Sequence, residues 1–142
     1  MELLKGKKGL ITGVLNDKSI AWAVARTAVQ EGAQIVMTNT PVAIRLGQAE
    51  ELARQLGCPL FEADATSLED LDRLVGSTME HFGGQFDFVL HSIGTSPNIR
   101  KKHPYNDLDY SLMGKTLDIS ALSFHKLLQT LYRKDALSEW GS

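Results

Sequence analysis

Short apolar runs alternate with longer segments of helical periodicity along this chain. The predicted strands span residues 8–13, 34–38, 60–63 and 86–92, and the predicted helices span residues 19–31, 49–56, 68–82 and 108–136. Such alternation is typical of successive β-α units joined by right-handed crossovers, which place parallel strands between two layers of helices. We therefore predict an α/β fold, a Rossmann-type doubly wound parallel sheet of about four strands in the order 3-2-1-4.

The fourth predicted strand and the helix after it indicate where this sheet ends. Residues 86–92 are almost wholly apolar, as expected of a strand that is buried on both faces. The last helix carries one stripe of apolar and small residues: Leu112, Thr116, Ile119, Ser123 and Leu127. The common six-stranded order needs further strands beside the fourth, and no run after residue 92 supplies one, so we expect a partial sheet.

Composition narrows the class of protein to one globular domain. The chain has 142 residues, of which 43% are hydrophobic and 23% charged, and its net charge of −2 provides no general attraction to nucleic acid or acidic membranes. A single cysteine, Cys58, excludes an internal disulfide, and neither a signal-peptide pattern nor an apolar run of membrane-spanning length is present. We therefore expect a cytoplasmic protein without nucleic-acid or membrane partners.

The first predicted strand runs through a glycine turn directly into a helix, which is the arrangement of a dinucleotide phosphate site. Gly13 lets a pyrophosphate approach the turn, and Ser19 and Ile20 at the helix start can donate N–H groups and a hydroxyl. The usual G-x-G-x-x-G spacing is absent, because Asp17 and Ser19 stand where many short-chain dehydrogenases carry their second and third glycines. An ordinary turn followed by a serine N-cap explains the same residues.

Two further motifs follow predicted strands at the edge where an open α/β sheet binds its ligand. Asp64 can accept a hydrogen bond from the exocyclic amine of adenine, and the N–H of Ala65 can donate to a ring nitrogen; an aspartate that caps the loop before a helix is the alternative. Ile93, between Ser92 and Gly94, can cover adenine or its ribose, and an apolar strand closing in a turn is again the alternative.

The end of the second strand bears on the choice of nicotinamide cofactor. A carboxylate at this place holds the ribose 2′-hydroxyl of NAD, whereas a nearby arginine accommodates the 2′-phosphate of NADP. Here the residues are Thr38-Asn39-Thr40-Pro41, with Arg45 five residues past Thr40. These residues alone leave NADH and NADPH both open.

Several residues that often carry chemistry receive structural interpretations. The four histidines and Cys58 lack metal-ligand spacing, so no metal site is predicted. His91 lies inside an apolar strand and is interpreted as a hydrogen-bonded structural histidine. The basic run at residues 100–103 is interpreted as a solvated loop, with docking of an acidic carrier protein as the alternative.

The combined motifs resemble the enoyl-acyl-carrier-protein reductases, a divergent branch of the short-chain dehydrogenases. The resemblance rests on Gly13-Val14 with Ser19-Ile20-Ala21-Trp22, on Asp64-Ala65 and on His91-Ser92-Ile93-Gly94. In that family a serine six residues after the glycine replaces the glycine-rich turn, and H-S-I-G replaces the common N-N-A-G. The segment Lys115–Ser120, followed by Ser123-Phe124, is similar to the family's fourth helix.

The resemblance implies hydride transfer from NADH to the β-carbon of a trans-2-enoyl thioester, carried by an acyl-carrier protein in fatty-acid biosynthesis. It implies cofactor contacts at Gly13, Ser19, Ile20, Thr40, Asp64, Ala65 and Ile93, and a substrate-side place for Ser96. Thr40 departs from the residue types of the family, and NADPH is not excluded. The resemblance also implies a homo-oligomer, which is a tetramer in intact family members.

The family's catalytic tyrosine and lysine have no counterpart in this chain. In the family they are separated by six residues, and in the wider superfamily by three; the tyrosine stabilises an enolate and the lysine holds the cofactor ribose. None of Tyr105, Tyr110 and Tyr132 is followed by a lysine at either distance. We therefore assign no catalytic residue in this chain. We expect residues 1–142 to be the N-terminal part of a single NAD(P)-binding domain that lacks the C-terminal strands and the catalytic helix. Such a part should be inactive alone and prone to self-association through the apolar edge of its fourth strand.

Two other classes of protein share these features in part. A short-chain ketoreductase, or a methyltransferase with another adenine ligand, uses the same strand-turn-helix, because fold does not determine chemistry. A non-catalytic nucleotide-binding or interaction module, complete at Ser142, is the second alternative.

Overall fold

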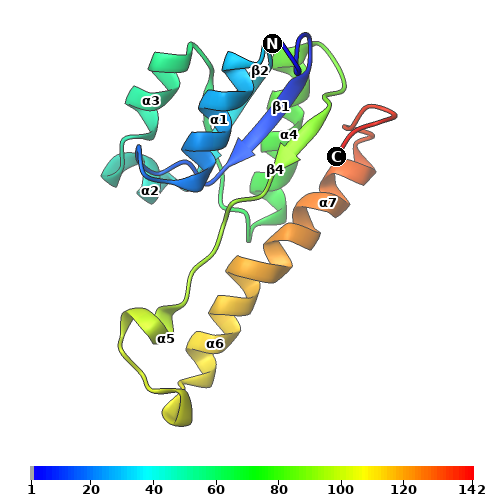
Figure 1. Cartoon of the computed structure of the whole chain (residues 1–142). Coiled ribbons are helices and arrows are strands. Elements are labelled where there is room, and N and C mark those ends of the chain that lie inside the picture. The colour runs from blue at the N-terminus through cyan, green and yellow to red at the C-terminus, as the bar shows by residue number, and fades with distance from the viewer. Residues whose placement is uncertain (1) are drawn as a thin grey trace.

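The computed structural model describes residues 2–142 and contains one four-stranded parallel sheet (Figure 1). The strands are β1 (Lys8–Thr12), β2 (Gln34–Asn39), β3 (Leu60–Glu62) and β4 (Phe88–Leu90). All neighbours pair in parallel, in the order β3-β2-β1-β4. The predicted fold class and strand order are therefore confirmed, with the third and fourth strands shorter than expected.

Seven α-helices and two short helical turns connect and flank these strands in the described part of the chain. They are α1 (Ile20–Gln30), α2 (Pro41–Leu46), α3 (Ala49–Leu56), α4 (Leu68–Phe82), α5 (Pro97–Arg100), the 3-10 turn η1 (Tyr105–Asp107), α6 (Tyr110–Leu117), the π turn η2 (Asp118–Leu122) and α7 (Ser123–Arg133). No helix of residues 2–142 combines the length and apolar character needed to cross a bilayer.

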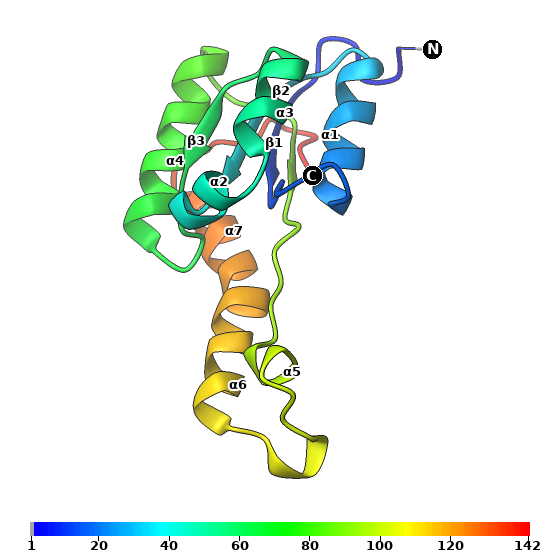
Figure 2. The same ribbon diagram turned by 90° about the vertical axis from the view of Figure 1, so that its left-hand side faces the viewer.

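Alternation along the strands divides the core into two layers. Leu10 pairs with Val36 in the register of β1 and β2, and both side chains belong to the cluster packed against α4 and α7. Ile11 and Met37 are the next pair and belong to the cluster packed against α1 and α3. Burial of each such side chain contributes about 1.5–3 kcal/mol, so the two layers fix the helices relative to the strand ends. Figure 2 shows α4 and α1 on opposite sides of the sheet.

The outer edge of β4 is partly covered by the last residues of the chain. Leu137 forms a parallel bridge with Phe86, the N–H of Ser142 donates to the carbonyl of Asp87 at 3.0 Å, and the N–H of Val89 donates to the carbonyl of Ser142 at 2.8 Å. The sheet has no further named strand beside β4, as expected, but the expectation of a free outer edge is wrong, because backbone groups of the last residues cover part of it without an apolar run. The strand itself is half-buried rather than buried on both faces.

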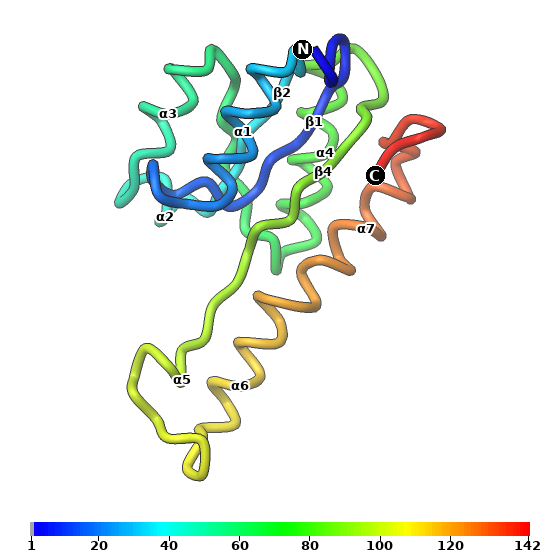
Figure 3. Tube along the Cα trace, viewed as in Figure 1, coloured from blue at the N-terminus to red at the C-terminus, as the bar shows by residue number. Residues whose placement is uncertain are grey.

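Residues 93–122 form an arm that leaves the sheet after β4 and returns along one helical path (Figures 1 and 3). The buried Asn98 closes the arm, because its side-chain oxygen accepts from the N–H of Asp109 and its amide donates to the Asp109 carbonyl, both at 3.0 Å. The single helix predicted over 108–136 is present as α6, η2 and α7 and ends at Arg133. The π turn η2 interrupts the regular α-helix between α6 and α7.

Candidate functional site

A cavity of about 160 Å³ lies at the carboxyl ends of β1, β2 and β3, beneath α4 and α7. Its polar lining comes from Thr12, Thr38, Asn39, Thr40, Asp64 and Thr66, and its apolar lining from Ala63, Ala65, Leu71, Leu74, Ile93, Ile119 and Leu127. Four residues predicted from sequence as a binding site, Thr40, Asp64, Ala65 and Ile93, meet in this cavity. A cavity of this size accommodates a group of the size of an aromatic ring system rather than a whole dinucleotide.

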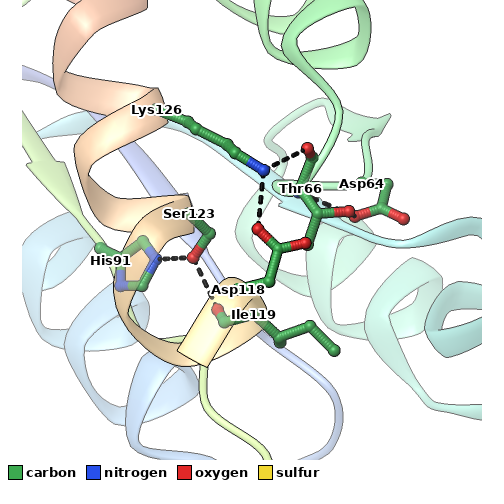
Figure 4. Close-up of polar contacts among 7 residues, drawn as sticks. All are labelled: Asp64, Thr66, His91, Asp118, Ile119, Ser123 and Lys126. Carbon is green, nitrogen blue, oxygen red and sulfur yellow. Dashed lines mark hydrogen bonds and ion pairs between the residues drawn. The ribbon is translucent and has the colours of Figure 1, made fainter. Parts of the chain in front are cut away.

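Asp64, in the loop after β3, forms hydrogen bonds with Thr66 (Figure 4) and with Asp70. Its Oδ1 accepts from the N–H of Thr66 at 2.9 Å and from the Thr66 hydroxyl at 2.7 Å, and its own N–H donates to Asp70 at 2.8 Å. That backbone hydrogen bond, together with one from Arg73, holds the pKa of the Asp70 carboxyl below its usual range. One carboxylate oxygen of Asp64 therefore caps the loop, as the alternative interpretation of this residue expects. Within residues 2–142, its Oδ2 and the N–H of Ala65 make no hydrogen bond.

Thr38 places an unpaired hydroxyl at the wall of the cavity. Its side chain is 3% exposed, and its Oγ1 is the one buried side-chain polar atom of the described residues without a hydrogen-bond partner. The neighbouring Thr12 is satisfied, because its hydroxyl donates to the carbonyl of Leu90 at 2.8 Å and accepts from the N–H of Ser92 at 3.1 Å. Since buried polar groups are nearly always paired, the hydroxyl of Thr38 marks a place for a water or ligand atom.

Sequence reasoning missed both threonines as site residues. The signal available was a polar residue in the last positions of an apolar strand, at the edge where ligands bind in this fold. Thr38 was considered only with its neighbours, for the choice between NADH and NADPH.

The turn that contains Gly13 lies beside the cavity and is closed by backbone contacts. Gly13 has a φ of +87°, and a Cβ there would lie 2.0 Å from the carbonyl oxygen of Ser92. Its N–H donates to the Thr38 carbonyl at 3.0 Å, which joins the turn to β2. Glycine is therefore required both by conformation and by the approach of the segment after β4.

Ser19 organises this turn rather than capping α1 with its side chain. Its hydroxyl donates a hydrogen bond to the carbonyl of Asn16 at 2.6 Å and accepts one from the N–H of Leu15 at 3.4 Å. It stands at the N-cap position, but no side-chain capping hydrogen bond forms, so the serine N-cap expected as an alternative is present in position only.

Two predicted residues lie away from the cavity. Ile20 is 75% exposed and, with Val24 and Ala28, lines a shallow groove of about 650 Å³ between α1 and the edge of β4, where Trp140 also lies. Ser96 stands at the N-cap of α5 in the arm. The structure thus gathers four of the eight predicted residues in one cavity and places Gly13 and Ser19 in the adjoining turn.

His91 follows β4 directly, where the prediction placed it inside the strand, and its side chain is hydrogen-bonded, as predicted. The Ser123 hydroxyl donates to the carbonyl of Ile119 at 2.6 Å, so the 2.8 Å contact with His91 requires the imidazole Nε2–H to be the donor (Figure 4). The ring also packs edge-on against Phe124, with centroids 5.4 Å apart. Burial lowers the pKa of His91 below its ordinary value. Across residues 2–142, no group of three or more His, Cys, Asp or Glu side chains could hold a metal ion.

A parallel sheet in the order β3-β2-β1-β4, helices on both faces and a cavity at the carboxyl ends define a Rossmann-type doubly wound protein. A family model described as "Enoyl-(Acyl carrier protein) reductase" matches residues 13–142. The chain belongs to the enoyl-acyl-carrier-protein reductase family.

Individual relatives agree with this family. The chain is 37% identical over 123 residues to an enoyl-[acyl-carrier-protein] reductase [NADH] of Rhizobium meliloti, a match that covers 86% of this chain and 44% of the relative. FabI from Alistipes finegoldii, solved as its NADH complex, is 60% identical with a TM-score of 0.98, over 99% of this chain and 50% of that one. The enzyme from Anaplasma phagocytophilum, solved with NAD, is 28% identical with a TM-score of 0.82 and is also half covered. The chain therefore spans about half the length of the relatives it matches.

Proposed function

We propose that this chain is the cofactor-binding part of an NADH-dependent enoyl-acyl-carrier-protein reductase of fatty-acid biosynthesis. The observation that carries the proposal is the cavity in which Asp64, Ala65 and Thr38 offer unused hydrogen-bonding groups beside apolar walls. Family membership favours this reaction over the ketoreductase and methyltransferase alternatives. The names of the relatives, and the NADH complex of the Alistipes finegoldii protein, favour NADH.

The residues of the cavity fit the adenine end of such a cofactor. The free oxygen of Asp64 is an acceptor suited to an exocyclic amine, and the unpaired N–H of Ala65 is a donor suited to a ring nitrogen. Ile93, Ile119 and Leu127 supply apolar surface for the faces of the ring. These groups match a flat ligand that is polar at its edge and apolar on its faces.

The turn from Gly13 to Ile20 fits a pyrophosphate in the same dinucleotide. The positive φ at Gly13 makes the tight turn that leads to α1, and the start of α1 presents N–H groups without intrahelical partners. Thr40 lines the adenine cavity, but its hydroxyl already accepts from the N–H of Ala43 at 3.2 Å and caps α2. A ribose contact at Thr40 would therefore use the second lone pair of this hydroxyl or its proton.

The residues present in the chain determine which parts of the reaction we assign to it. NADH supplies the hydride when bound, and residues 1–142 hold its adenosine and pyrophosphate, with Ser96 on the substrate side. No Tyr/Lys pair of the family spacing occurs in the sequence, so we expect binding without turnover. In this proposal the chain forms the N-terminal part of a single domain whose further strands and catalytic helix complete the site. The acyl-carrier protein with its enoyl thioester and a homo-oligomeric assembly belong to the same proposal.

Titration of the purified chain with NADH, monitored by the fluorescence of NADH, tests the cofactor proposal. Asp64→Asn is the diagnostic variant, because the amide oxygen can still accept from Thr66 while an N–H donor replaces the free acceptor. We expect affinity for NADH to fall by about tenfold or more, the effect of losing a hydrogen bond to a charged group. Asp72→Asn is the matched control, because Asp72 is an exposed carboxylate paired with Lys134 outside the cavity.

Three outcomes would count against the proposal. They are a folded chain that does not bind NADH, an equal loss of affinity in the Asp64 and Asp72 variants, and preferential binding of NADPH. The last outcome would retain the site but exclude NADH as its cofactor.

A further inference from the structure

The π turn η2 changes which residues of the long helix share a face. In a regular α-helix, residues eight apart are rotated by about 80° from one another, since each residue turns the chain by about 100°. One extra residue in a π turn makes such a pair equivalent to a spacing of seven, about 20° short of two full turns. Residues 118 and 119 begin this turn, and residues 126 and 127 follow it in α7 with a spacing of eight from each. The π turn therefore aligns both pairs.

One aligned pair lines the cavity, and the other forms an ion pair outside its lining. Ile119 and Leu127 line the cavity together. Asp118 and Lys126 form an ion pair of 2.7 Å, with side chains 42% and 27% exposed. One local change in the helix thus creates a continuous apolar wall and a charged pair beside it.

Lys126 reaches beyond its own helix to the loop that carries Asp64. Its Nζ donates to the Thr66 carbonyl at 2.8 Å, and Thr66 in turn donates to Asp64 through its N–H and hydroxyl (Figure 4). Asp118 holds the ammonium group from the other side. The connection therefore runs from η2 through Lys126 to the backbone next to Ala65.

We propose that Lys126 is a positioning residue that holds the Asp64–Thr66 loop in the conformation that receives the adenine end of the cofactor. The proposal rests on the function proposed above, since it gives this loop its ligand. A loop that is already ordered loses less conformational freedom on binding, so its ligand binds more tightly. The charge-assisted hydrogen bond to the Thr66 carbonyl is of the stronger class and is partly shielded from solvent.

Lys134 provides a matched control on the same helix. It closes α7 and pairs with Asp72 of α4 at 2.9 Å, and its side chain is as exposed as that of Lys126. It does not line the cavity or contact the loop after β3. If the two substitutions act only by weakening the packing of α7, the Lys126 and Lys134 variants should behave alike. If Lys126 positions the loop, only the Lys126 variants should change the loop.

The experiment compares Lys126→Met, Lys126→Arg and Lys134→Met in the purified chain by two measurements. The first is amide hydrogen exchange of residues 64–67 without ligand, and the second is titration with NADH and with AMP. We expect Lys126→Met to accelerate exchange in the loop and to weaken both ligands by about three- to tenfold, and Lys126→Arg to stay within about twofold of the wild type. Lys134→Met should lower the thermal stability about as much as Lys126→Met does, but it should leave hydrogen exchange in the loop and the affinity for both ligands unchanged. Asp118→Asn is measured alongside, because it removes the charge that holds Lys126 at a half-exposed position, and it should shift both readouts in the same direction.

The two measurements separate the two proposals. Unchanged exchange at residues 64–67 in Lys126→Met, or equal effects of Lys126→Met and Lys134→Met, would overturn the positioning role. Failure of the wild-type chain to bind NADH or AMP would overturn the proposed function, and with it the ligand assigned to this loop. Faster loop exchange with unchanged affinity would also overturn the proposal, because the loop would then be held for stability alone.

Discussion

Replacing Gly13 by alanine should destabilise the chain strongly, because two separate costs meet at this position. The backbone φ of +87° is disfavoured for residues with a Cβ, at about 1–2 kcal/mol. The new Cβ would also lie 2.0 Å from the carbonyl oxygen of Ser92, in a contact made by backbone rather than by a movable side chain. Overpacking of this kind costs about 1–3 kcal/mol.

The expected loss in the free energy of unfolding is therefore about 2–5 kcal/mol, a large share of the about 5–15 kcal/mol typical of a domain. For a chain of this length, the melting temperature should fall by between about 4 and 20 °C. Gly114→Ala is the matched control, because a Cβ there meets nothing within 4 Å and the residue lies inside α6. This control should raise stability by about 0.5–1 kcal/mol, since alanine is the better helix former.

Thermal melts by circular dichroism and urea denaturation of the two variants and the wild type measure these changes. The reasoning would be refuted by a Gly13→Ala protein that melts within about 2 °C of the wild type, since its costs should total at least about 2 kcal/mol. A similar loss in Gly114→Ala would also refute it, because it would show that glycine replacement alone, rather than the geometry at residue 13, lowers stability.

Three other predictions follow from single groups. Thr38→Val removes a buried hydroxyl without a partner, so the unliganded chain should keep its stability or gain up to about 1 kcal/mol in urea denaturation, while NADH titration should show weaker binding. Burial lowers the pKa of His91 from 6.5, so the neutral imidazole contributes its full stability above pH 6.5 and this contribution is lost as the pH falls towards the lowered pKa. His91→Gln should flatten that part of a plot of the free energy of unfolding against pH. An unchanged plot would contradict this. Burial raises the pKa of the Cys58 thiol to about 11, so iodoacetamide at pH 8 should label the folded chain at least about tenfold more slowly than the urea-unfolded chain, and equal rates would contradict this.

The sheet was predictable from sequence because its determinants are local and repeated. Each β-α unit has an apolar run followed by a helical pattern, and the handedness of crossovers restricts how such units can be ordered. The motifs after β3 and β4 follow parallel strands, so Asp64 and Ile93 were expected at the same end of the sheet, but β2 and β1 separate their strands and the strand order alone does not bring the two residues into one cavity.

The features that were missed depend on geometry without a sequence signal. Ser142 pairs with β4 through its backbone alone, and no side-chain pattern marks such a contact. The π turn adds one residue to a helix whose stripe from Ile119 to Leu127 looks continuous when written as intervals of four. The Thr38 hydroxyl is unpaired only because its neighbours in the folded protein offer it no partner, which cannot be inferred from residue type.

The central position of β1 also has a consequence for the rate of folding. β1 pairs on one side with β2, which follows after one helix, and on the other side with β4, about 80 residues later in the chain. Contacts between segments so distant in sequence close slowly, because a long loop must be ordered before the pairing compensates for it. During synthesis, β1 must therefore keep one edge unpaired until Leu90 has emerged from the ribosome, and in that interval the edge is open to pairing with other strands.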